Sequence, residues 1–180
     1  MTVSRILVLA GSPRKNGNTD RLAASFAKGA GEHNEVGIVS VVDLAVHPCT
    51  GCNTCFMREG NECFQHDDMP LLYGKLRETD VLVVASPVYF YGVSAQLKAV
   101  IDRLHTPLRN SFPIRKLGLI LVGAADLPDL FDAIIAQYKL ILRFFHLEDA
   151  GMVLVRGAKD KGDVREEDLD KAFLLGRSIT

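Results

Sequence analysis

Short apolar runs alternate with longer stretches in which apolar residues recur at helical spacing. The runs are rich in Val, Ile and Leu and cover 5–10, 36–42, 81–85, 117–122 and 152–155. Such continuous runs are typical of strands buried on both faces of a parallel sheet. Helices are predicted over 19–28, 68–78, 94–104, 129–145 and 166–177. The alternation predicts an α/β fold with three layers, in which helices cover both faces of a doubly wound parallel sheet.

The pattern predicts one domain spanning residues 1–180, because no repeat or linker interrupts it and the length suits a single core. Its one long irregular stretch is 44–66, which contains every cysteine of the chain. A loop of that length inside a compact domain is usually functional or mobile. Ligands of doubly wound sheets bind beyond the carboxyl ends of the strands. The loops at those ends are therefore the candidate sites.

Charge and composition narrow the class of protein. The net charge of −1 gives no electrostatic reason to expect a nucleic acid or an anionic membrane as partner. No apolar run reaches the roughly 18 residues of a membrane-spanning helix, and the run 6–10 is too short for a signal peptide. We therefore expect a cytoplasmic protein with reduced thiols. Metal or redox chemistry then becomes the better explanation of the four cysteines.

The loop 11–19 follows the first predicted strand and opens the first helix. Its hydroxyl, amide and cationic side chains include Ser12, Arg14, Asn16, Asn18 and Thr19. A helix N-terminus adds unpaired N–H groups and partial positive charge, which suit a terminal phosphate. The loop has neither the Gly-Lys-Ser/Thr of a P-loop nor the GxGxxG of a Rossmann fold. A helix start that is merely capped after a turn is the alternative.

The loop 86–94 follows the third predicted strand and carries three consecutive aromatic residues, Tyr89, Phe90 and Tyr91. They cannot all face a core, so some must lie at the mouth of the sheet, where a planar ring could stack. Backbone N–H groups of this loop could bind the acceptor edge of a flavin. An aromatic plug beneath a loop is the alternative interpretation.

Together, GSPRKNGNT and SPVYFYGVSAQLKAVIDR resemble the NAD(P)H-dependent FMN reductase family of flavodoxin-like proteins, over about residues 5–103. The resemblance implies a flavodoxin-like sheet of order 2-1-3-4-5, FMN as cofactor, NAD(P)H as donor and a homodimer or homotetramer. It assigns the phosphate to Ser12, Arg14, Asn18 and Thr19, to which the loop chemistry adds Asn16. It assigns the flavin ring to Pro87, Val88, Tyr89, Phe90 and Gly92, with Ser94 nearby. A third flavin loop is expected around 123–126, which lacks the glycine-rich character often found there.

The cysteines Cys49, Cys52, Cys55 and Cys63 form the pattern CxxCxxCx7C. Tight CxxC steps let one loop supply thiolates to different corners of a cubane. The pattern resembles the iron–sulfur flavoproteins, a branch of the same family in which such a motif binds a 4Fe-4S cluster. A reduced loop without metal is the second interpretation and a four-thiolate zinc site the third. The Cx5R spacing from Cys52 to Arg58 is set aside as a phosphatase loop, because Glu59 would repel phosphate.

The expected activity is that of an FMN-dependent oxidoreductase, in which FMN performs the chemistry and no side chain is assigned a catalytic role. Electrons would pass from NAD(P)H, or a ferredoxin, through FMN to a quinone, a flavin or another small acceptor. One alternative is an electron-transfer protein that connects a redox partner, a 4Fe-4S cluster and FMN. A flavin-binding regulatory module without turnover is the other.

Overall fold

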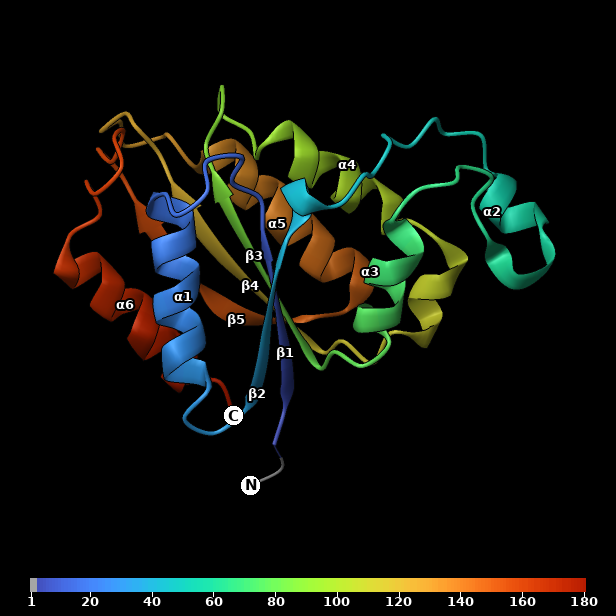
Figure 1. Ribbon diagram of the computed structural model, residues 1–180, viewed down its shortest axis with the longest axis horizontal. Helices are drawn as coiled ribbons and strands as arrows, with labels where there is room; N and C mark the ends of the chain where they lie inside the picture. The colour runs from blue at the N-terminus through green and yellow to red at the C-terminus, as the bar shows by residue number, and fades with distance from the viewer. Residues whose placement is uncertain (1–2) are drawn as a thin grey trace.

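Residues 3–180, which the computed structural model describes, form a five-stranded parallel sheet between two layers of helices (Figure 1). The strand order is β2-β1-β3-β4-β5. The strands are β1 (Arg5–Ala10), β2 (Glu35–Ser40), β3 (Val81–Pro87), β4 (Lys116–Val122) and β5 (Glu148–Val155). The predicted strand order is thus confirmed. The last strand begins earlier than predicted because its polar first half, Glu148 and Asp149, still pairs with β4.

The five predicted helices are confirmed, with no end moved by more than three residues. They are α1 (Asn18–Ala30), α3 (Met69–Leu76), α4 (Ala95–Arg103), α5 (Asp132–Phe145) and α6 (Glu166–Arg177). The short elements η1 (Val41–Asp43), α2 (Thr54–Met57), η2 (Glu59–Asn61) and η3 (Pro107–Ser111) were not predicted. In Figure 1, α1 and α6 cover one face of the sheet, and α3, α4 and α5 cover the other.

Alternating side chains of the strands divide the core between these two layers. On β1, Ile6 and Val8 join the cluster that contains α1 and α6, whereas Leu7 and Leu9 join the cluster beneath α3, α4 and α5. Successive strand side chains point to opposite faces, so a run that is apolar at every position serves both layers. This explains why the strands could be recognised as continuous apolar runs.

Glycines allow α1 and α6 to touch through their backbones. A Cβ atom on Gly29 would lie 2.0 Å from the carbonyl oxygen of Phe173, and one on Gly176 would lie 2.1 Å from that of Phe26. Any larger residue would force the helices apart. The position of α1 is thereby fixed, and with it the N-terminus that follows the loop after β1.

The layer on the other face is less completely covered. Helix α5 buries Ile134 and Tyr138 but leaves Leu140 and Phe144 exposed by 55% and 54%. A cavity of about 840 Å³ extends between α4, η3 and α5 over the side chains of β3 and β4. Its lining is mainly apolar, and it lies along the helices, reaching the loop after β3 only at Val93. No helix in residues 3–180 has the length and apolarity needed to cross a membrane.

Candidate functional site

The loops after the central strands meet at the carboxyl edge of the sheet, at the top of Figure 1. The N–H of Gly11 donates to Ala85 at 2.8 Å, and that of Val88 donates to Val122 at 2.7 Å. These hydrogen bonds continue the parallel ladders past the strands and fix how the loops leave the sheet. The edge is where doubly wound sheets bind their ligands.

The loop 11–19 is a compact turn whose backbone bonds to itself. The Oγ of Ser12 accepts a hydrogen bond from the N–H of Arg14 at 3.2 Å, and the N–H of Gly17 donates to the Arg14 carbonyl at 3.2 Å. Gly17 precedes α1 and makes no side-chain cap. The first N–H groups of α1 therefore remain available to an anion, at the positive end of the helix dipole.

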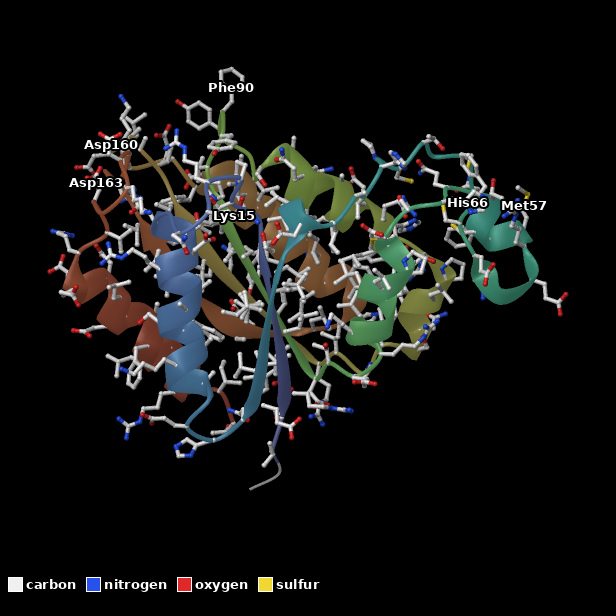
Figure 2. All side chains as sticks on the ribbon, in the orientation of Figure 1. Lys15, Met57, His66, Phe90, Asp160 and Asp163 are labelled. Carbon is white, nitrogen blue, oxygen red and sulfur yellow. The ribbon has the colours of Figure 1, made fainter. Side chains whose placement is uncertain are left out.

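The two cationic side chains of this loop reach neighbouring segments. The Nζ of Lys15, labelled in Figure 2, lies 2.6 Å from a carboxylate oxygen of Asp43, and this hydrogen bond raises the pKa of Lys15. Arg14 donates from Nη1 to the carbonyl of Lys159 at 3.2 Å. Both side chains lie at the rim of the turn. Arg14 adds positive potential to the helix N-terminus, whereas the charge of Lys15 is paired with Asp43.

Asn18 connects the loop 11–19 to the segment after β5. Its Nδ2 donates to the carbonyl of Asp160 at 2.8 Å, and its Oδ1 accepts from the N–H of Gly162 at 3.0 Å. The amide is thus used to hold the 158–162 segment beside the turn. Asp160 is labelled at the same edge as Lys15 in Figure 2. This partner was not predicted from the sequence: the glycines at 157 and 162, which have positive φ, mark a tight turn but do not reveal the bonds to Asn18.

The aromatic loop is a two-residue turn in an uncommon conformation. Tyr89 and Gly92 exchange N–H to carbonyl hydrogen bonds of 2.9 and 3.0 Å. Between them, Phe90 and Tyr91 have φ angles of 48° and 63°. Turns with two positive φ angles normally use Gly, Asn or Asp, and bulky residues there are strained. Phe90 is 99% exposed and stands above the sheet in Figure 2. Strain of this kind concentrates at functional sites.

Ser94 joins the two loops from the inside. Its Oγ donates to the carbonyl of Gly11 at 2.6 Å and accepts from the N–H of Leu97 at 3.3 Å, which caps α4. Its own N–H donates to the Oγ of Ser86 at 3.0 Å, and both serines are fully buried. With these bonds formed inside the protein, the Ser94 side chain holds the loops in place. A Cβ on Gly11 would lie 2.8 Å from Leu97, so this junction also requires glycine.

The cysteine loop, residues 44–66, projects from the sheet at the right of Figure 1, where it contains α2 and η2. Met57 and His66 are labelled in this region of Figure 2. All four cysteines are free; Cys49 and Cys52 are exposed, and Cys55 and Cys63 are half-buried. No three His, Cys, Asp or Glu side chains within residues 3–180 are grouped as a metal site.

Three of the four sulfur atoms nevertheless each take part in a hydrogen bond. The N–H of Gly51 donates to Cys49 Sγ and that of Gln65 to Cys63 Sγ, both at 3.5 Å. Cys52 Sγ lies 3.1 Å from the hydroxyl of Thr54, which lowers the pKa of this thiol to about 7. Burial raises the pKa of Cys55. Donors aimed at sulfur favour the thiolate, the form that binds iron or zinc.

Comparison with known proteins identifies the family of the chain. A family model described as NADPH-dependent FMN reductase matches residues 4–158. The chain belongs to this family. The resemblance recognised in the sequence is thereby confirmed, and so is membership of a family of FMN-dependent oxidoreductases.

Individual relatives of this FMN reductase family member fall into two groups. The iron-sulfur flavoprotein MJ1083 of Methanocaldococcus jannaschii is 39% identical over 124 residues, which cover 67% of this chain and 63% of that protein. The putative NAD(P)H-dependent FMN-containing oxidoreductase YwqN of Bacillus subtilis is 28% identical over 170 residues, which cover 89% of this chain and 88% of that protein. The chain thus spans less than two thirds of the first relative.

The solved structures agree on the fold. An NAD(P)H:quinone oxidoreductase from Methanothermobacter marburgensis superposes with a TM-score of 0.77 at 16% identity, over 98% of this chain and 99% of that one. At this level of identity the likeness establishes the flavodoxin-like architecture alone.

Proposed function

We propose that this chain is an FMN-dependent oxidoreductase that binds FMN where the loops 11–19 and 86–94 meet. The observation that carries the proposal is the α1 N-terminus, left without a side-chain cap beside the strained aromatic turn at Phe90 and Tyr91. A phosphate acceptor next to a platform for a planar ring suits a mononucleotide. Residues 1–180 would act as one domain, because both helix layers pack on one sheet.

The chemistry of the residues present suits FMN. Ser12, Arg14, Asn16 and Thr19 would surround the phosphate together with the N–H groups of α1. Pro87, Val88, Tyr89, Phe90 and Gly92 would line the ring. Asn18 and Ser94 would act by holding these loops, given the hydrogen bonds they already make. When bound, FMN supplies the hydride and electron transfer, so the protein's task is to bind, orient and shield it.

We further propose that Cys49, Cys52, Cys55 and Cys63 ligate a 4Fe-4S cluster. Support comes from four thiols on one loop, from hydrogen bonds at three of the sulfurs and from a relative named as an iron-sulfur flavoprotein. A bound cluster would supply one-electron transfer. Zinc and a reduced, metal-free loop are the alternatives that an analysis of metal content separates from it.

We also propose that the chain forms a homodimer or homotetramer through the exposed face of α5. Leu140 and Phe144 lie on that face, and an apolar surface of this kind is commonly covered by a partner. Sedimentation of the wild type against Phe144→Glu would test the proposal. A cytoplasmic location, where the thiols stay reduced, remains part of the same proposal.

The experiment for the flavin is anaerobic mixing of the FMN-loaded protein with NADPH or NADH in a stopped-flow spectrometer. We expect the flavin absorbance to bleach with one or both nucleotides. Failure of both, with the FMN still bound, would remove the proposed donor. Faster reduction by a reduced ferredoxin would favour the second candidate, an electron-transfer protein, which the cysteine loop supports.

Protein purified without oxygen tests the cysteine proposal directly. We expect about four irons per chain and a broad absorbance shoulder beside the flavin bands. Zinc in place of iron, or flavin absorbance alone, would overturn the cluster assignment without affecting the FMN site.

A further inference from the structure

The two ends of the cysteine loop are joined by one buried arginine that comes from α4. Nη1 of Arg103 donates to the carbonyl of His47 at 3.0 Å and to the carboxylate of Asp67 at 2.7 Å. Nη2 reaches the other carboxylate oxygen at 3.3 Å. His47 lies two residues before Cys49, and Asp67 lies four residues after Cys63. Arg103, which is not part of the loop, therefore joins its two ends. We call the region around His47 and Asp67, where the ends meet, the neck of the loop.

Asp67 completes the connection. Its carboxylate also accepts hydrogen bonds from the N–H of His47 at 3.0 Å and from the N–H of Met69 at 3.1 Å, which caps α3. Burial raises the pKa of Asp67, but the hydrogen bonds from Arg103, His47 and Met69 outweigh it and hold the pKa below its usual value. The Tyr73 hydroxyl donates to the Arg103 carbonyl at 2.7 Å and ties the end of α4 to α3.

The ion pair between Arg103 and Asp67 is buried, so its loss should be costly. The Arg103 and Asp67 side chains are 3% and 0% exposed. A buried ion pair needs all its hydrogen-bonding capacity used, and loss of one partner leaves an uncompensated charge. Beyond the neck, by contrast, neither α2 nor η2 contains a buried residue. The loop therefore has little core of its own. Apart from the Phe56 ring, whose centroid lies 5.7 Å from that of His105, its attachment to the domain depends on the neck.

We propose that Arg103, acting through Asp67, is a positioning residue that holds the cysteine loop closed and so keeps Cys49 and Cys63 in fixed relation to α4. The role of Arg103 toward a cluster rests on the proposed iron–sulfur site. The closed neck itself is a feature of the chain without metal. The same helix follows Ser94, the residue that joins the two flavin loops. Its nine residues span about 14 Å. Helix α4 thereby acts as a rigid spacer between the flavin edge and the cysteine loop.

Amide hydrogen exchange of the metal-free protein tests the proposal, with Arg103→Gln and Asp67→Asn as the variants. We expect exchange of residues 45–68 to accelerate by about tenfold or more, because charged hydrogen bonds are lost, while β1 and β3 are unchanged. Arg115→Gln is the control. The Arg115 side chain is 69% exposed and lies 3.5 Å from Asp80, so this change removes an exposed arginine from an ion pair. The control should leave the loop unchanged.

A conservative variant separates positioning from general destabilisation. In Arg103→Lys, the ammonium group can replace the two bonds of Nη1 but not that of Nη2, so exchange should fall between wild type and Arg103→Gln. If Arg103→Gln accelerates exchange in β1 and β3 as well, the exchange rates of residues 45–68 are compared in Arg103→Lys and Asp67→Asn instead. Unchanged exchange of 45–68 in all three variants, or equal acceleration everywhere, overturns the proposal.

Iron retention supplies the second readout. In reconstituted protein, a chelator should remove iron about tenfold faster from Arg103→Gln than from wild type, while bound FMN is retained. Equal rates of iron loss in the two proteins would show that Arg103 does not help to hold the cluster. If the wild type binds no iron, the cluster assignment fails, and hydrogen exchange still decides whether Arg103 closes the neck.

Discussion

The loop 11–19 and the cysteine loop both carry candidate ligands, but they are held in different ways. The former is fixed by its own backbone, by Gly11 packed on Leu97 and by Asn18, and it leads directly from a strand into a helix. The latter extends away from the sheet and is attached at its neck mainly through side chains, with one backbone hydrogen bond from Asp68 to Ala45. A site built from backbone is preorganised before any ligand binds, whereas a site on a long loop depends on what its ends and its ligand supply.

Because of this difference, the free energy needed to open the two sites locally should differ. The proposed flavin edge lies over the continuous core of β1 and β3, so opening it requires disruption of that core. The cysteine loop can open without disturbing the sheet, because its helices bury no side chain. We therefore expect mutations in one site to leave the other intact.

The largest effect should follow from Gly11→Val. A Cβ at this position lies 2.8 Å from Leu97 and 3.1 Å from Ser94 Oγ, and a branched side chain adds further overlap. Overpacking typically costs about 1–3 kcal/mol, so we expect FMN affinity to fall by about a hundredfold as the two loops separate. Fluorescence titration with FMN measures it, and Gly74→Ala, which meets open space, is the control. Wild-type affinity in Gly11→Val would show that the junction does not shape the flavin site.

The converse change is Cys63→Ser, which replaces one proposed ligand and leaves the sheet edge untouched. We expect iron affinity to fall by at least about tenfold, since even indirect partners of a metal site are worth this much. FMN binding should be unchanged. Metal analysis and flavin absorbance of the same sample give both quantities. Parallel loss of FMN would contradict the independence of the two sites.

The sequence was informative where local pattern determines structure. The apolar runs of the strands, the helix that begins after Gly17 and the aromatic loop after β3 are each defined by residues close together in the chain. The contacts that hold the sites were not predictable in this way. Asn18 bonds to a residue 142 positions away, and Arg103 bonds to one 36 positions away. A polar residue gives no local sign of so distant a partner.

A moderate effect is expected for the reactivity of Cys52. Hydrogen bonds lower the pKa of this thiol to about 7, that from the Thr54 hydroxyl first, followed by those from the Thr54 backbone and the Thr50 side chain, so roughly half is thiolate at neutral pH. In metal-free protein, alkylation of Cys52 should rise with a midpoint near pH 7. Thr54→Val should raise the pKa and slow alkylation at pH 7 by about tenfold. Mass spectrometry of modified peptides gives the rates, and Cys55, whose pKa burial raises, serves as the internal reference. Equal rates in wild type and variant would exclude Thr54 as the cause.

The smallest effect concerns the strain stored in the aromatic turn. Phe90 has a φ angle of 48°, a conformation that asparagine tolerates far better. Phe90→Asn should therefore raise the free energy of unfolding of the flavin-free protein by about 1 kcal/mol. The same change removes an exposed ring from the proposed flavin platform, so FMN affinity should fall severalfold. Urea unfolding and FMN titration measure the two quantities.

Opposite signs for stability and affinity would mean that the strained turn is retained for binding. Greater stability with unchanged FMN affinity would instead leave the strain without a role in the flavin site. Lys98→Gln is a suitable control, because it removes an exposed ion pair with Asp102 on α4 and leaves the turn as it is. Its effect on unfolding should stay within about 0.5 kcal/mol. This contrast tests the sheet-edge site at the turn where two bulky residues have positive φ angles.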